Sequence, residues 1–166
     1  GRMERQPFGT FLVVNRPVQP TRRGNVETIG ENDYRGLTDT WRALQDGSGK
    51  LQFDDRLTRR QRDALMQAFA TLLSRPTGRE LVQFAVRDAG RHRIEAGAGY
   101  VNPKDETRPQ HDVGVPVYRN VEIVVKSLDD RIVAMPLFVA LGHELGHVHS
   151  RSTGTSLEDV ELNNEY

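Results

Sequence analysis

The feature that most constrains this chain is the motif H-E-x-x-H, formed by His143, Glu144 and His147. Positions i and i+4 of an α-helix lie one turn apart on the same face, so both imidazoles can reach one metal ion. Glu144 is set off from the two rings, where its carboxylate can hold a water molecule beside the metal and take its proton. The spacing therefore predicts a helix that carries a zinc site for hydrolysis.

The residues around the motif predict that this helix is buried. Residues 137–141 are apolar on all sides, and Leu145 and Val148 continue the apolar surface past the motif. Pro136 suits the first helical turn, where its missing N–H costs nothing. Polar side chains in so apolar a helix are costly to bury without partners, and a metal ion provides one. The alternative is a chance motif whose histidines bind backbone carbonyls.

Length, charge and cysteine content narrow the class of protein. A chain of 166 residues suits one buried core, so we expect a single domain over residues 1–166. Residues 1–50 carry no motif, and the domain can be a piece of a longer chain. Equal numbers of basic and acidic residues, 23 of each, argue against nucleic-acid and membrane partners. The absence of cysteine excludes disulfides and thiolate zinc sites.

Local patterns along the rest of the chain predict both strands and helices. Strands are expected at residues 8–15, 25–29, 92–95 and 120–126. Helices are expected at residues 33–44, 58–73, 77–90, 135–149 and 155–166. Capping boxes are expected at the starts of the third and fifth of these helices, at Thr77 with Glu80 and at Thr155 with Glu158.

The order of elements before the motif favours an α+β, zincin-like fold. Strand 120–126 is followed by a short connection and then by the motif helix, which is the usual zincin order. We expect a small mixed sheet packed on the buried motif helix, with additional helices and a loop over residues 102–116. In zincins an edge strand beside the metal binds an extended peptide by β-addition. The sequence does not decide whether residues 121–126 form that edge.

A catalytic zinc usually has three protein ligands. The metzincin continuation requires Gly at position 150 and His at 153, where this chain has Ser150 and Thr153, so that class is excluded. The remaining common ligand is a glutamate on a following helix. Three candidates share one face of the expected last helix: Glu158, Glu161 and Glu165. We choose Glu165, because Asn164-Glu165 resembles the N-E step of gluzincins, with Glu161 second; the aspartate that gluzincins place three residues later would fall beyond the sequence.

The remaining histidines and tyrosines have less defined roles. His149 lies two residues past His147 and points elsewhere on the helix, so we interpret it as a surface or supporting residue. His92 and His111 are isolated in the sequence and are interpreted as structural or exposed. Three tyrosines are open candidates for the phenol that stabilises an oxyanion. They are Tyr100, Tyr118 and Tyr166.

From about Leu65 onward the chain resembles the NleD-like effector zinc metallopeptidases, which occur among type III secreted effectors and as toxin domains of bacterial polymorphic toxins. The matching segments are "LLSRPTGRELVQ", a middle rich in Gly, Asn and Pro, "PLFVALGHELGHVHSRSTG" and the final "ELNNEY". The resemblance implies zinc on His143 and His147, with Glu144 as the general base of an endopeptidase. It also implies secretion by a bacterium, delivery into a host or rival cell and a specific protein substrate there.

We therefore expect a monomeric zinc metalloendopeptidase, with an immunity protein or a chaperone as a possible partner. One alternative is a zinc-binding interaction module without proteolytic activity. Retention of Glu144 argues against that module, because metal binding alone does not need the carboxylate. The other alternative is an unrelated interaction domain with a chance motif.

Overall fold

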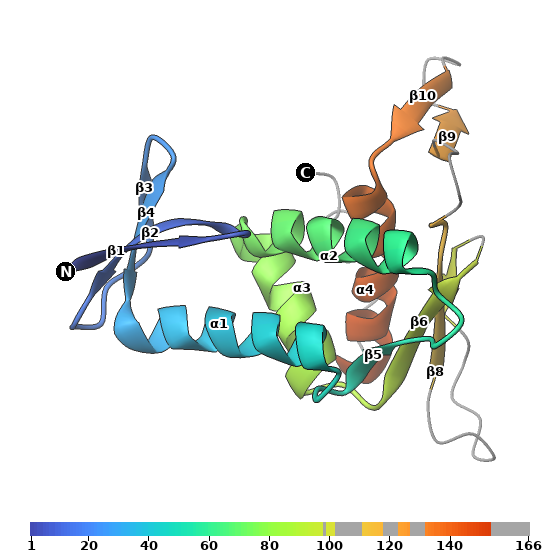
Figure 1. Ribbon diagram of the computed structural model, residues 1–166, viewed down its shortest axis with the longest axis horizontal. Coiled ribbons are helices and arrows are strands. Elements are labelled where there is room, and N and C mark those ends of the chain that lie inside the picture. The colour runs from blue at the N-terminus through green and yellow to red at the C-terminus, as the bar shows by residue number, and fades with distance from the viewer. Residues whose placement is uncertain (98, 102–110, 118–122, 127–131, 154–166) are drawn as a thin grey trace.

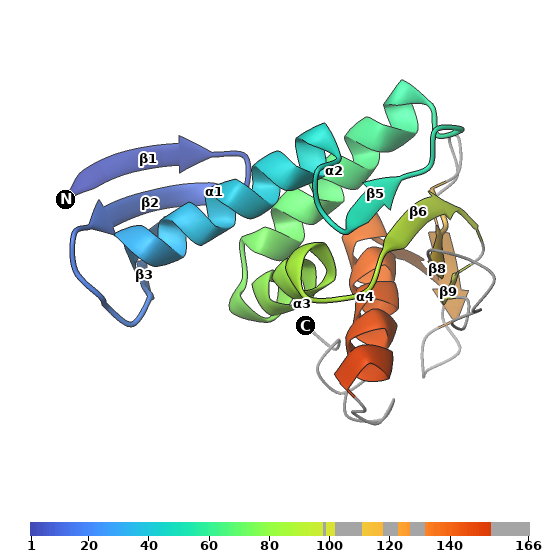
Figure 2. The ribbon, with the colours of Figure 1, turned by 90° about the horizontal axis from the view of Figure 1, so that it is seen from below.

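The computed structural model describes residues 1–97, 99–101, 111–117, 123–126 and 132–153. These residues form four helices and ten strands in three small sheets, so the fold class is mixed α+β, as predicted. The two four-stranded sheets lie at opposite ends of the molecule, and the helices lie between them (Figures 1 and 2).

The first sheet is built from the N-terminal 30 residues. Its strands are β1 (Arg2–Gln6), β2 (Gly9–Val14), β3 (Thr21–Arg23) and β4 (Val26–Gly30), in the order β1-β2-β4-β3. β2 and β4 pair in parallel and correspond to the two strands predicted here. β1 and β3 were not expected, because these two edge strands are mostly exposed and polar and so lack a hydrophobic pattern.

Helix α1 (Glu31–Asp46) follows β4 directly and confirms the helix predicted over residues 33–44. Aromatic rings join it to the first sheet: Phe8 lies 5.6 Å from Trp41, and Phe11 lies 5.5 Å from Tyr34, between ring centroids. Tilted aromatic pairs at such distances add to the stabilisation from burial. The first sheet and α1 therefore share a packed hydrophobic interface.

Helices α2 (Arg59–Leu73) and α3 (Pro76–Arg87) follow as a packed pair. Thr58 caps α2 and forms a capping box with Gln61. The capping box predicted at Thr77 and Glu80 is wrong, because α3 already begins at Pro76 and both residues lie inside the helix. Proline has no N–H to satisfy and a helical φ, so it starts the helix earlier than the capping pattern suggested.

The second sheet contains β5 (Leu51–Phe53), β6 (His92–Ala96), β7 (Tyr100–Val101) and β8 (His111–Val115), in the order β5-β6-β8-β7. β5, β6 and β8 run parallel, whereas β7 is antiparallel to β8. The prediction of a loop over residues 102–116 is therefore wrong at residues 111–115, which form β8. Val113 and Val115 are fully buried, so tertiary burial decided a strand whose five residues gave little signal of their own.

A separate hairpin precedes the motif helix. β9 (Ile123–Lys126) pairs antiparallel with β10 (Ile132–Met135), and the hairpin projects from the start of helix α4 (Leu137–Thr153) (Figure 1). The strand predicted over residues 120–126 is confirmed at residues 123–126, which form β9. The direct connection predicted from that strand to the helix is wrong, because β10 intervenes. α4 begins two residues later than predicted and continues to Thr153. The helix predicted over residues 155–166, with its capping box, lies outside the described residues.

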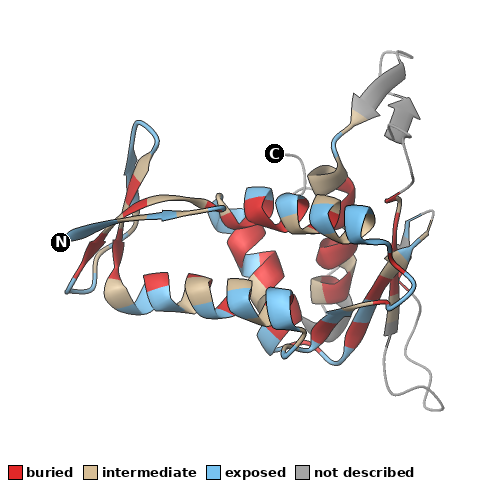
Figure 3. Cartoon of the chain, in the orientation of Figure 1, coloured by how far each residue is buried: buried red, intermediate tan, exposed pale blue. Residues whose placement is uncertain are grey.

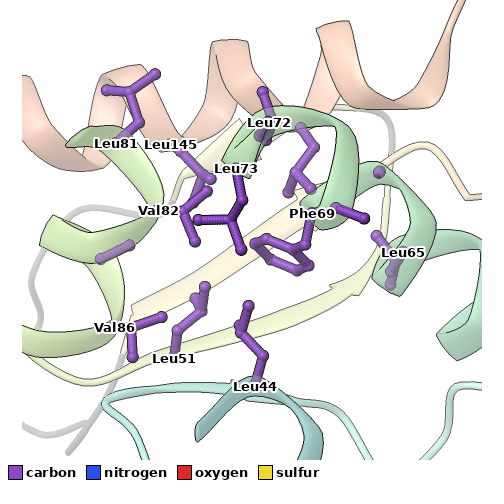
Figure 4. Close-up of a cluster of buried hydrophobic side chains, with 14 of the residues drawn as sticks. Leu44, Leu51, Leu65, Phe69, Leu72, Leu73, Leu81, Val82, Val86 and Leu145 are labelled. Atoms are coloured by element: carbon purple, nitrogen blue, oxygen red, sulfur yellow. The ribbon is translucent and has the colours of Figure 1, made fainter. Parts of the chain in front are cut away.

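Buried residues gather where α2, α3 and α4 meet the second sheet (Figure 3). Leu145 of α4 packs among Phe69 and Leu73 of α2 and Val82 of α3, each fully buried (Figure 4). Burying one such side chain contributes roughly 1.5–3 kcal/mol relative to leaving it exposed. This core therefore holds the motif helix in a defined position. Within the described part of the chain, no helix is long and apolar enough to cross a membrane.

Candidate active site

The H-E-x-x-H motif occupies the middle of α4. The helix starts after Pro136, whose carbonyl accepts hydrogen bonds from the amides of Val139 at 3.0 Å and Ala140 at 3.5 Å. It continues without interruption past the motif, so His143 and His147 are held one turn apart on one face.

The two imidazoles converge at their outer nitrogens. The Nε2 atoms of His143 and His147 are 2.9 Å apart, and the rings stand at 90° to each other. In a tetrahedral zinc site with bonds of about 2.0–2.1 Å, two nitrogen ligands lie about 3.3 Å apart. The observed separation is close to that value. It also suits an N–H···N hydrogen bond between two neutral rings, whose proton a metal ion would replace. The pair fits zinc in both donor chemistry and spacing.

Glu144 lies on a different side of α4 from this pair. It is buried, with 5% of its surface exposed, whereas both histidines are half-buried. Its carboxylate faces the turn between β6 and β7: a Cβ atom added at Gly99 would lie 3.4 Å from Glu144 Oε1. The carboxylate thus lies between the helix and the edge of the second sheet.

β7 lies at the end of the second sheet as far as the described residues define that sheet. α4 packs against both β7 and its neighbour β8. Residues 123–126 belong instead to the β9–β10 hairpin, so the possibility that residues 121–126 form the sheet edge beside the motif is not supported by their pairing. β7 has only two residues, too few for a periodic pattern that would have predicted it.

The three glutamates predicted as candidates for the third ligand lie outside the described residues: Glu158, Glu161 and Glu165. Within the described ranges, no group of three His, Cys, Asp or Glu side chains is arranged to hold a metal ion. The structure therefore brings together two of the expected ligands, His143 and His147, and places the expected base, Glu144, on another side of the same helix.

The other candidates are spread over the molecule. The ring of His149 lies 4.6 Å from that of Phe84 in α3, and His92 is buried in β6, with 3% exposed. His111 lies in β8 and Tyr100 in β7, but their side chains are outside what the structure describes, as are Tyr118 and Tyr166 entirely.

No protein-family model, no curated protein and no solved structure matches this chain. The function proposed below therefore depends on the motif, on the geometry around it and on the resemblance of the sequence segments described above.

Proposed function

We propose that this protein is a zinc-dependent endopeptidase with a zincin-like domain, related to the NleD-like effectors and toxin domains. The observation that supports this best is the convergence of the His143 and His147 Nε2 atoms, 2.9 Å apart, one residue from a buried carboxylate. A mixed sheet packs against the motif helix, and its antiparallel edge strand β7 is one of the two strands that α4 contacts, which also agrees with the zincin-like arrangement.

His143 and His147 would hold the zinc ion, and Glu165 is the proposed third ligand, with Glu161 and Glu158 as alternatives. Zinc, when bound, polarises a carbonyl and lowers the pKa of water toward neutrality. Glu144 would position the attacking water, accept its proton and then deliver that proton to the leaving amine. Its burial between α4 and the β6–β7 turn restricts the carboxylate to few positions, which favours this transfer.

The substrate would be an extended segment of a protein, lying along β7 by β-addition. By the same resemblance, we propose that the protein is secreted by a bacterium and acts inside a host or rival cell, as a monomer, with a chaperone or an immunity protein as its binding partner before delivery.

The first test is the zinc content per chain, measured by elemental analysis of purified protein. We expect about one zinc per chain in the wild type, and loss of that zinc in His143→Ala. His149→Ala is the matched control, because His149 lies on the same helix but its ring packs against Phe84. Equal zinc in wild type and His143→Ala, or zinc loss in His149→Ala alone, would contradict the assigned site.

The second test separates an enzyme from a zinc-binding module. Wild type and Glu144→Ala are incubated with a peptide library made from a digested proteome, and new termini are identified by mass spectrometry. We expect cleavage by the wild type and none by Glu144→Ala, with zinc retained in both. Cleavage by Glu144→Ala at the wild-type rate would overturn the assigned mechanism. Zinc binding without cleavage of the library or of folded candidate substrates would favour the non-proteolytic module.

A further inference from the structure

The turn between β6 and β7 approaches the proposed general base through a glycine. Gly99 has φ +94° and a hypothetical Cβ position 3.4 Å from Glu144 Oε1. The turn is anchored on both sides: the amide of Gly97 donates to the Val115 carbonyl at 2.9 Å, and Tyr100 pairs with Gly114 in the ladder between β7 and β8. The position of Gly99 relative to Glu144 is therefore set by backbone pairing on either side of it.

Two other glycines with positive φ in the described residues, Gly24 and Gly47, serve as a comparison, because their turns alone account for the glycine. Gly24 and Gly47 have φ of +63° and +70°, and a Cβ added at either would meet nothing within 4 Å. At Gly9, with φ +143°, and at Gly99, an added Cβ would instead stand against a side chain, 3.2 Å from the Phe11 ring and 3.4 Å from Glu144 Oε1 respectively. Gly99 therefore differs from the other three in that its neighbour is the proposed base.

We propose that Gly99 is a positioning residue of the candidate site, which leaves clearance beside the Glu144 carboxylate for the main chain of a bound peptide. The proposal rests on the function proposed above. A Cβ at this position would lie at van der Waals contact with Oε1. In the proposed mechanism it would take up space beside the carboxylate that the attacking water and the peptide need. It would leave the histidine pair untouched, because its nearest side-chain neighbour is Glu144 rather than His143 or His147.

The test uses a probe that occupies this space without turnover. The purified protein is loaded with Co²⁺, whose visible spectrum reports the ligands of the metal, and is titrated with acetohydroxamic acid, which binds the metal and donates a hydrogen bond to a neighbouring carboxylate. We compare wild type, Gly99→Ala and Gly47→Ala. Gly47→Ala is the matched control, because it places a side chain at positive φ at the end of α1, in open space.

We expect all three proteins to load the same amount of Co²⁺ and both variants to lose a similar amount of thermal stability. The dissociation constant of the hydroxamate should rise about tenfold in Gly99→Ala, which corresponds to about 1.4 kcal/mol, and should stay unchanged in Gly47→Ala. If Gly99→Ala does not fold, Gly99→Asn replaces it, since Asn enters the positive-φ region more readily and still carries a Cβ.

Equal affinity for hydroxamate in wild type and Gly99→Ala would overturn the proposal and leave the proposed zinc site standing. Weaker binding in both glycine variants would also overturn it, because general backbone strain would then be the cause. Failure of the wild type to bind Co²⁺ would refute the proposed function itself, and the role of Gly99 with it.

Discussion

Arg79 of α3 forms a two-pronged ion pair with Glu27 of β4, in which its Nη2 donates to Glu27 Oε1 at 2.9 Å and its Nη1 donates to Oε2 at 2.5 Å. Both side chains are buried, with 9% and 6% of their surfaces exposed. The Nε–H of Arg79 also donates to the Leu73 carbonyl at 2.7 Å. The pair joins the first sheet to the helices that pack against α4.

Removing Arg79 should be strongly destabilising, because Glu27 stays buried and keeps only Arg22, whose Nη2 lies 3.2 Å from Glu27 Oε1 and whose side chain is 39% exposed. Arg79→Ala is expected to lower the free energy of unfolding by about 3–5 kcal/mol, measured by urea denaturation. Arg2→Ala is the control, since the Arg2–Glu31 pair is exposed and solvent already screens it. Similar small losses in both variants would show that Arg22 or water compensates the charge of Glu27 when Arg79 is absent.

Zinc removal should lower thermal stability if His143 and His147 hold the metal, because a ligand that binds only the folded state stabilises that state by mass action. A chelator is expected to reduce the Tm of the wild type and of Glu144→Gln, and to leave the Tm of His147→Ala unchanged. Differential scanning calorimetry with and without chelator measures the difference. A chelator-dependent Tm in His147→Ala would indicate that the metal binds elsewhere.

The stability of the loop between β5 and α2 should depend on pH through Asp54. The Arg56 guanidinium donates to its carboxylate at 2.7 Å, and the Arg56 amide donates at 2.9 Å, which together lower the pKa of Asp54 to about 2. Since the folded-state pKa lies below the ordinary value, this contribution is present above about pH 4 and is lost as the pH falls through about 2.

Asp54→Asn is therefore expected to be less stable than the wild type at pH 5, and the difference should shrink toward pH 2. The effect is modest, because 80% of the Arg56 side chain is exposed and its charge is screened. Urea denaturation at several pH values measures it. Arg56→Ala should reduce the pH dependence of the free energy of unfolding. If that dependence were unchanged in Arg56→Ala, it would arise from a titratable group other than Asp54.

The close packing of the first turn of α3 on the end of α2 should be intolerant of a side chain at Gly78. A Cβ there would overlap the Leu72 carbonyl oxygen and would lie 2.8 Å from the Leu72 Cα, so the two helices would have to separate. Gly78→Ala is expected to cost about 3 kcal/mol, within the range for overpacking a buried contact. Gly90→Ala is the control, because its added atom meets nothing within 4 Å. Equal Tm values for the two variants would contradict this packing.

The helices and the histidine pair could be predicted because helical geometry is local. His143 and His147 face one another in any α-helix that contains them, and the apolar spacings of Tyr34, Leu37 and Leu44 locate α1 without reference to a distant residue. The Pro76 boundary was misassigned because a capping pattern and an N-terminal proline compete for the same turn, and their relative strength is not visible in the pattern alone.

The tertiary structure decided what surrounds the His143–His147 pair. β8 became a strand because Val113 and Val115 are buried between neighbouring strands, and the two residues of β7 became the nearest edge because they pair with β8. Gly99 meets Glu144 although 45 positions separate them in the sequence. Sheet neighbours depend on which segments are brought together and buried, whereas a helix depends on residues one turn apart. The amino-acid sequence therefore determined which side chains can carry the chemistry, and the packing of α4 against the second sheet decided what faces them.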